Sequence, residues 1–117
     1  MVMNKEYKVI FHVSEKEKIK LSLNNIKNLI IDLGIENLQI ELVINSVAVE
    51  EFKNKDFKYE KEIHELSKLG VKFVLCKNSL KGMNIDEKEL IEPINIVPSG
   101  VGELVKKQGD GWAYIRP

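Results

Sequence analysis

The only cysteine of the chain, Cys76, follows the apolar run Val71–Leu75 and precedes Lys77, Asn78 and Ser79. If the run is a strand and the residues after it begin a helical turn, the backbone N–H groups around Asn78 and Ser79 face the sulfur. A helix N-terminus and a neighbouring lysine both favour the thiolate, which is the nucleophilic form of cysteine. Because no second cysteine is present, a reactive Cys76 would pass an acquired group to another molecule.

The alternative interpretation of Cys76 is structural. Free cysteine is among the most frequently buried residue types. Here it directly follows three apolar residues, so it fits equally well as a small residue of the core. The two interpretations differ in whether the thiol can be reached from solvent.

Two further polar residues, His12 and Asn45, stand at the ends of the apolar runs Tyr7–Val13 and Leu38–Ile44. A histidine near a thiol orients a substrate or stabilises a thiolate, although an isolated histidine is more often a hydrogen-bonded structural residue. The sequence thus predicts a pocket that supports the Cys76 thiolate, lined by His12, Asn45, Lys77, Asn78 and Ser79.

A second candidate site is the segment Pro98–Gly102, in which small residues begin a predicted helix. Backbone N–H groups at such a helix start bind anions. The glycine spacing is not that of a dinucleotide-binding loop, because the third residue after Gly102 is Val105. A plain helix cap is the structural alternative. The residues predicted to bind the anion are Ser99, Gly100, Val101 and Gly102.

Composition argues against several classes of function. The chain has 18 basic and 18 acidic residues, so its zero net charge argues against a nucleic-acid surface and favours self-association. Its apolar runs are too short to span a bilayer, and no signal peptide is visible, so we expect no membrane partner. The single cysteine favours a reducing, cytoplasmic setting. Without zinc-type spacing or a phosphate-binding loop, we predict no metal and no cofactor.

Strand-like and helix-like runs alternate along the 117 residues, which suffice for one domain, residues 1–117. The predicted strands are Tyr7–Val13, Leu38–Ile44, Val71–Leu75, Ile94–Val97 and Trp112–Ile115. The predicted helices are Ser14–Leu33, opened by a capping box of Ser14 and Glu17, then Phe57–Leu69, Asp86–Leu90 and a helix after Ser99. Alternation of this kind predicts a parallel sheet with helices on its faces. Ligands bind outside the carboxyl ends of such strands, where the candidate residues converge.

Several segments, in their order and spacing, resemble the DsrE/DsrF-like family over almost the whole chain, in particular its small single-domain members. These segments are Lys8–Val13, Asn25–Leu29, Gly70–Phe73, Cys76–Leu80, Val97–Val105, Gln108 and Gly111–Ile115. The resemblance implies a three-layer α/β/α domain with a five-stranded parallel sheet, flavodoxin-like in outline. It also implies a homo-oligomer, often a trimer or a hexamer.

In the sulfur-relay members of this family, a cysteine just after the third strand carries sulfur as a persulfide between partner proteins, and Cys76 matches it. His12, Asn25 and Asn28 match positions typical of the subgroup that have no assigned role. After the second strand the family pattern leads us to expect a glycine-containing turn, where this chain has Asn45-Ser46-Val47-Ala48-Val49. We expect this departure to reshape the pocket wall beside Cys76.

We therefore predict a cytoplasmic sulfur-handling protein, a carrier like the sulfurtransferases, which takes sulfur from a donor protein and gives it to an acceptor protein. The alternative is a non-catalytic homo-oligomeric module that binds a small anion, with Cys76 as a wall residue. A third interpretation is an assembly subunit whose Trp112 and Tyr114 serve oligomer contacts only.

Overall fold

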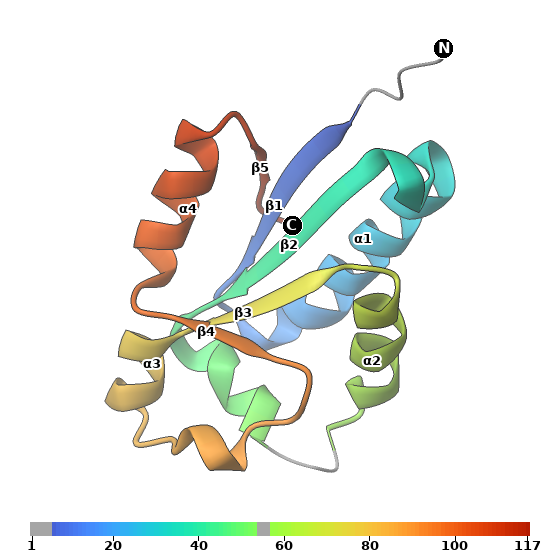
Figure 1. Cartoon of the computed structure of the whole chain (residues 1–117). Helices are drawn as coiled ribbons and strands as arrows, with labels where there is room; N and C mark the ends of the chain where they lie inside the picture. Colours follow the sequence, from blue (N-terminus) through green and yellow to red (C-terminus); the bar gives the residue numbers. More distant parts are fainter. Residues whose placement is uncertain (1–5, 54–56) are drawn as a thin grey trace.

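The computed structural model describes residues 6–53 and 57–117 and contains one five-stranded sheet (Figure 1). All neighbouring strands are parallel, in the order β4-β3-β2-β1-β5. The strands are β1 Tyr7–Val13, β2 Leu38–Ile44, β3 Lys72–Cys76, β4 Asn95–Val97 and β5 Ala113–Ile115. The predicted α/β class and the parallel five-stranded sheet are confirmed.

Helices cover both faces of the sheet, which confirms the three-layer arrangement. Figure 1 shows α1 and α2 on one side of the sheet and α4 on the other, with α3 directly after β3. The α-helices are α1 Ile19–Leu33, α2 Glu60–Lys68, α3 Lys77–Gly82 and α4 Gly100–Gly109. Short 3-10 helices are η1 Lys16–Lys18, η2 Ile35–Asn37, η3 Ser46–Lys53 and η4 Glu87–Glu89.

The two faces of the sheet carry cores of unequal size. In β1, Val9 and Phe11 belong to the large core that α1 and α2 cover, whereas Ile10 belongs to a small core with Val43 and Leu104 under α4. This division follows the two-residue period of a strand. Because both faces are buried, β2 is apolar at five of its seven positions, as expected for a central parallel strand.

The start of the first helix differs from the sequence prediction. Residues 16–18 form the 3-10 turn η1, α1 begins only at Ile19, and neither start has a side-chain cap. Ser14 instead accepts a hydrogen bond on Oγ from Nη2 of Arg116 at 3.0 Å. The predicted capping box of Ser14 and Glu17 is therefore wrong, because a residue at the other end of the chain competes for the Ser14 hydroxyl.

The strand register brings the candidate residues to one edge of the sheet. Val13 of β1 pairs with Ile44 of β2, Ile44 pairs with Leu75 of β3, and Cys76 pairs with Val97 of β4. The segments that follow these residues therefore all leave the sheet at its carboxyl edge, as predicted. Among the described residues, no helix is long and apolar enough to cross a membrane.

Candidate functional site

Cys76 is the last residue of β3 and the residue that precedes the first turn of α3. Its side chain is largely buried, with 6% of its surface exposed. The backbone N–H groups of the first helical turn have no partner within the helix itself, so they are free to bond groups placed at its start. The thiol is thus placed where the sequence predicted, at a strand end against the start of a helix.

Hydrogen-bond donors converge on the Cys76 sulfur from two segments of the chain. Burial raises the pKa of the Cys76 thiol, because it penalises the charged thiolate. Hydrogen bonds from the Ser79 side chain and from the backbone of Gly100, Ser79 and Asn78 outweigh burial, and the pKa lies below its usual value. The structure thus combines a sheltered thiol with the donors that a thiolate needs.

The hydroxyl group of Ser79 is oriented by a second contact. The backbone N–H of Ser46 donates to Ser79 Oγ at 2.8 Å. That bond occupies an acceptor position of the hydroxyl group and leaves its O–H to donate to the Cys76 sulfur. Ser46, in the segment after β2, therefore orients the hydroxyl group that donates to Cys76.

Ser46 has a φ of 55°, a left-handed conformation that glycine adopts at lower cost. It lies in the segment where the family pattern led us to expect a glycine. We expect Ser46→Gly to raise the free energy of unfolding by about 0.5–1 kcal/mol, since it removes backbone strain and keeps the N–H bond to Ser79. Urea unfolding of Ser46→Gly and Ser46→Ala tests this, because alanine keeps the strain. Equal stability of the two variants would contradict the expectation.

The helix start predicted to bind an anion belongs to the same site as the thiol. A Cβ atom built on Gly100 would lie only 3.3 Å from the Cβ atoms of both Cys76 and Asn45. Ser99 caps α4, as predicted, because its Oγ accepts the N–H of Gly102 at 3.0 Å. With the backbone of Gly100 bonded to Cys76 and Gly102 bonded to Ser99, few amides remain for a separate anion. Val101 is exposed.

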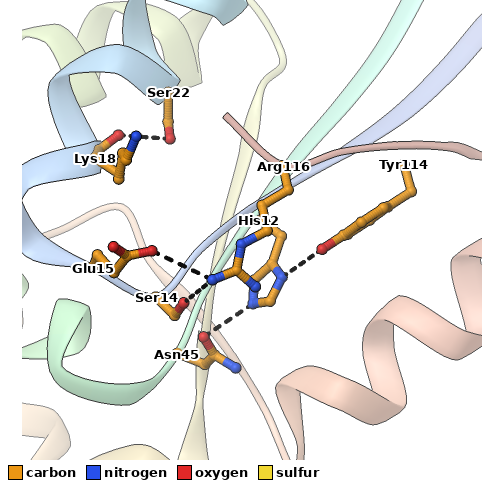
Figure 2. Close-up of polar contacts among 8 residues, drawn as sticks. All are labelled: His12, Ser14, Glu15, Lys18, Ser22, Asn45, Tyr114 and Arg116. Atoms are coloured by element: carbon orange, nitrogen blue, oxygen red, sulfur yellow. Dashed lines mark hydrogen bonds and ion pairs between the residues drawn. The ribbon is translucent and has the colours of Figure 1, made fainter.

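His12 lies on the same edge in a hydrogen-bonded chain of three side chains (Figure 2). Its Nε2 lies 3.0 Å from Asn45 Oδ1, and its Nδ1 lies 2.8 Å from the hydroxyl oxygen of Tyr114. An amide oxygen only accepts, so Nε2 carries the proton, and in the neutral ring Nδ1 accepts the Tyr114 O–H. Burial lowers the pKa of His12, the Asn45 bond opposes this, and the charge of Arg116 lowers the pKa further. His12 is therefore a neutral hydrogen-bond donor at pH 7.

Tyr114 and Arg116 were not among the residues predicted to form the site. Tyr114 reaches His12 because β5 pairs with β1, with Tyr114 beside Ile10. Arg116 donates to Ser14 and forms an ion pair with Glu15 at 3.4 Å (Figure 2). The sequence suggested only an oligomer contact for Tyr114, because it does not show which strand lies beside β5.

Lys77 does not support the Cys76 thiolate, as the sequence had suggested it would. Its Nζ lies 3.8 Å from a carboxylate oxygen of Glu87, and both side chains are about half exposed. Lys77 is not among the groups that shift the pKa of Cys76. The thiolate is therefore supported by hydroxyl and amide donors rather than by the adjacent ammonium group. In the described residues, no group of three or more His, Cys, Asp or Glu side chains is placed to hold a metal ion.

The relationship of this chain to known proteins is consistent with its fold and site. The model of the DsrE/DsrF-like family matches residues 5–117. The chain belongs to the DsrE/DsrF-like family. Cys76 and the donors around it thus lie in a domain whose family includes sulfur-relay proteins. A comparison with curated proteins gives no match.

Solved structures of similar fold include two proteins of unknown function. One, from Methanobacterium thermoautotrophicum, is 38% identical with a TM-score of 0.87, and the match covers 96% of this chain and 100% of that one. The ychN protein from E. coli is 18% identical with a TM-score of 0.76, covering 97% and 99%. A conserved protein from Bacteroides thetaiotaomicron is 14% identical with a TM-score of 0.72, covering 94% of each chain. The last two similarities concern the fold alone.

Proposed function

We propose that this DsrE-like protein is a cytoplasmic sulfur carrier that holds sulfane sulfur on Cys76 as a persulfide. The observation that carries the proposal is the convergence of the Ser79 hydroxyl group and three backbone groups on the Cys76 sulfur. Such donors favour the thiolate, which is the form that attacks a sulfur donor. A reducing compartment suits a carrier whose single thiol must stay free between transfers.

The proposed step is an exchange of a sulfur–sulfur bond. The Cys76 thiolate attacks the outer sulfur of a donor persulfide, R–S–SH, and forms Cys76–S–SH. The sulfur–sulfur bond of the donor breaks, and R–S⁻ leaves with its electron pair. Attack by an acceptor thiolate on the outer sulfur of Cys76 then returns the Cys76 thiolate. Sulfur moves without net oxidation, so the exchange needs no cofactor.

Intact mass spectrometry tests the carrier function. We expect the reduced protein to gain one sulfur atom from glutathione persulfide and to lose it on addition of dithiothreitol. Cys76→Ser should gain none, because the chain has no other cysteine. Sulfur uptake by the variant equal to that of the wild type, or no uptake by the wild type while its thiol is reduced, would contradict the proposal.

We also propose that the protein is a homo-oligomer that uses the outer face of α4. Val101 and Val105 stand one turn apart on α4, and 63% and 65% of their surfaces are exposed. In Figure 1, α4 is the long helix on its side of the sheet, whereas α1 and α2 share the other side. Exposed apolar residues that lie together on one element are typical of contact surfaces.

We expect Val105→Lys to reduce the assembly to monomers, because a charge in an apolar contact must be desolvated. Ile31→Lys is the matched control, since Ile31 is an exposed apolar residue on α1, in the opposite layer. Size-exclusion chromatography with light scattering gives the mass of each variant. A wild-type monomer at all concentrations, or an assembly that only Ile31→Lys dissociates, would contradict this arrangement.

A further inference from the structure

We infer that Asn45 binds the outer sulfur of the Cys76 persulfide, and that Tyr114 and His12 hold its amide in the orientation that this requires. The inference rests on the proposed carrier function and assigns the group that stabilises the bound sulfur. It makes Asn45 a contact residue, and it makes His12 and Tyr114 positioning residues.

Asn45 and Cys76 lie on either side of the start of α4. The Cβ atoms of both residues are 3.3 Å from the point that a Cβ on Gly100 would occupy, so they are at most twice that distance apart. The backbone of Asn45 is anchored, because its N–H donates to the carbonyl oxygen of Val13 at 3.1 Å. The Asn45 side chain therefore begins from a fixed point beside the thiol.

The orientation of the Asn45 amide follows from its hydrogen bond with His12. Oδ1 accepts the His12 N–H at 3.0 Å, and the Tyr114 hydroxyl group keeps the ring in this tautomer from the other side. The amide nitrogen Nδ2 must then point away from His12, as Figure 2 shows. Within residues 6–53 and 57–117, Nδ2 has no hydrogen-bond partner, so its two N–H donors are free for a bound group.

The outer sulfur of a persulfide needs a hydrogen-bond donor that the groups around the Cys76 Sγ atom do not supply. Its negative charge lies on the outer sulfur, one bond beyond Sγ, and a buried charge must be hydrogen-bonded. The donors from Gly100, Asn78 and Ser79 are bonded to Sγ itself. His12 is 92% buried and both of its ring nitrogens are bonded, so it cannot supply the contact. Asn45 lies close to Cys76 and has side-chain N–H donors that no group of the described residues uses.

The test measures the half-life of the Cys76 persulfide after the donor is removed, by intact mass. Asn45→Ala keeps the Cβ atom that faces Gly100 and removes the amide, and we expect the half-life to fall about tenfold or more. His12→Gln keeps an N–H donor near the position of Nε2 and should stay within about threefold of the wild type, whereas His12→Leu should resemble Asn45→Ala.

A double-mutant cycle separates positioning from an independent role of His12. If His12 acts through Asn45, the variant with both Asn45→Ala and His12→Leu should lose no more than Asn45→Ala alone. Additive losses, a His12→Gln variant as impaired as His12→Leu, or an unchanged Asn45→Ala half-life would each overturn the inference. Tyr114→Phe removes the hydroxyl group that bonds His12 and keeps the aromatic ring. Because Tyr114 is partly exposed, this change leaves no cavity in the core. It should shorten the half-life in the same direction, and an unchanged half-life would count against the role of Tyr114.

The outcome for the wild type distinguishes this inference from the carrier function. If the wild type takes up sulfur and Asn45→Ala holds it equally long, the carrier function stands and the role of Asn45 is refuted. If the wild type takes up no sulfur, the carrier function fails and the role of Asn45 fails with it. Urea unfolding of the reduced variants, with midpoints close to that of the wild type, shows that a shorter half-life does not come from a loss of the fold.

Discussion

Replacing Glu41 with glutamine is expected to abolish a loss of stability that the wild-type protein undergoes between pH 6.5 and pH 8. Glu41 lies on β2 under α4, and only 2% of its surface is exposed. In the described structure its Oε2 has no hydrogen-bond partner. Burial first, then the hydrogen bond and the charge of Glu103, raise the pKa of Glu41 to about 8, although Lys107 and Lys72 oppose this.

The sign of the effect follows from linkage between protonation and folding. Glu41 keeps its proton in the folded protein up to about pH 8 and loses it in the unfolded chain near its ordinary pKa of 4.5. The free energy of unfolding therefore falls as the pH rises between these two pKa values, by up to about 1.4 kcal/mol per pH unit. His12, with a lowered pKa, acts in the opposite direction below its ordinary value of 6.5. Above pH 6.5 the remaining contribution of His12 is small, and it is the same in the Glu41→Gln protein and in its background.

Urea unfolding at pH 6.5 and pH 8 measures this dependence. Each protein should also carry Cys76→Ser, so that thiol ionisation does not contribute. We expect the background protein to lose about 1.5 kcal/mol over this interval and the Glu41→Gln protein to lose almost nothing. Glu65→Gln, at an exposed position on α2, is the matched control and should retain the loss. Equal pH dependence in the Glu41→Gln protein and the control would show that Glu41 does not hold the proton.

Gly100→Ala is expected to weaken both the fold and the support of the thiolate. The added Cβ would meet Cβ of Cys76 and Cβ of Asn45 at 3.3 Å and Cγ1 of Val43 at 3.4 Å. These atoms are close to the backbone of the sheet and cannot swing aside, so α4 must shift outward by a few tenths of an ångström. Overpacking of this kind costs about 1–3 kcal/mol, partly offset by the better helix propensity of alanine.

The same shift lengthens the hydrogen bond between the Gly100 backbone and the Cys76 sulfur. We therefore expect Gly100→Ala to raise the pKa of Cys76 toward its ordinary value and to slow alkylation at pH 7. Gly102→Ala is the matched control, because its added Cβ would meet only Ser99, at an ordinary 3.5 Å. Unfolding and alkylation measured on both variants test the contact. If both behave alike, the close approach of α4 to Cys76 has no effect on the thiol.

Local patterns predicted the elements of this fold and the edge on which the site lies. The strand before Cys76, the helical turn after it and the cap at Ser99 all follow from residues within four positions of one another. The convergence of Cys76, Asn45 and the start of α4 then followed from the general rule for parallel sheets. The order of the strands did not, because periodicity carries no information on which strands pair.

The contacts that the sequence missed join distant parts of the chain. Tyr114 bonds His12 across 102 residues, and Arg116 takes the hydroxyl group of Ser14 across the same separation. Both depend on the pairing of β5 with β1, which no local signal specifies. Glu41 is the charged residue of a mostly apolar strand, and its burial could be known only once α4 was placed over that face. The hydrogen bonds of His12 and Ser14 and the burial of Glu41 therefore depend on how the strands and α4 are arranged, which the sequence alone does not show.

The reactivity of Cys76 in the native protein is the measurement that tests the account most directly. The rate of alkylation by iodoacetamide should be recorded from pH 5 to pH 10, with and without denaturant. We expect native Cys76 to react, with a half-maximal rate at a pH below about 8.5, the value for a free thiol. A thiol that reacts only after denaturation, or one whose rate follows ordinary thiol ionisation, would contradict the claim that Cys76 is a supported thiolate nucleophile.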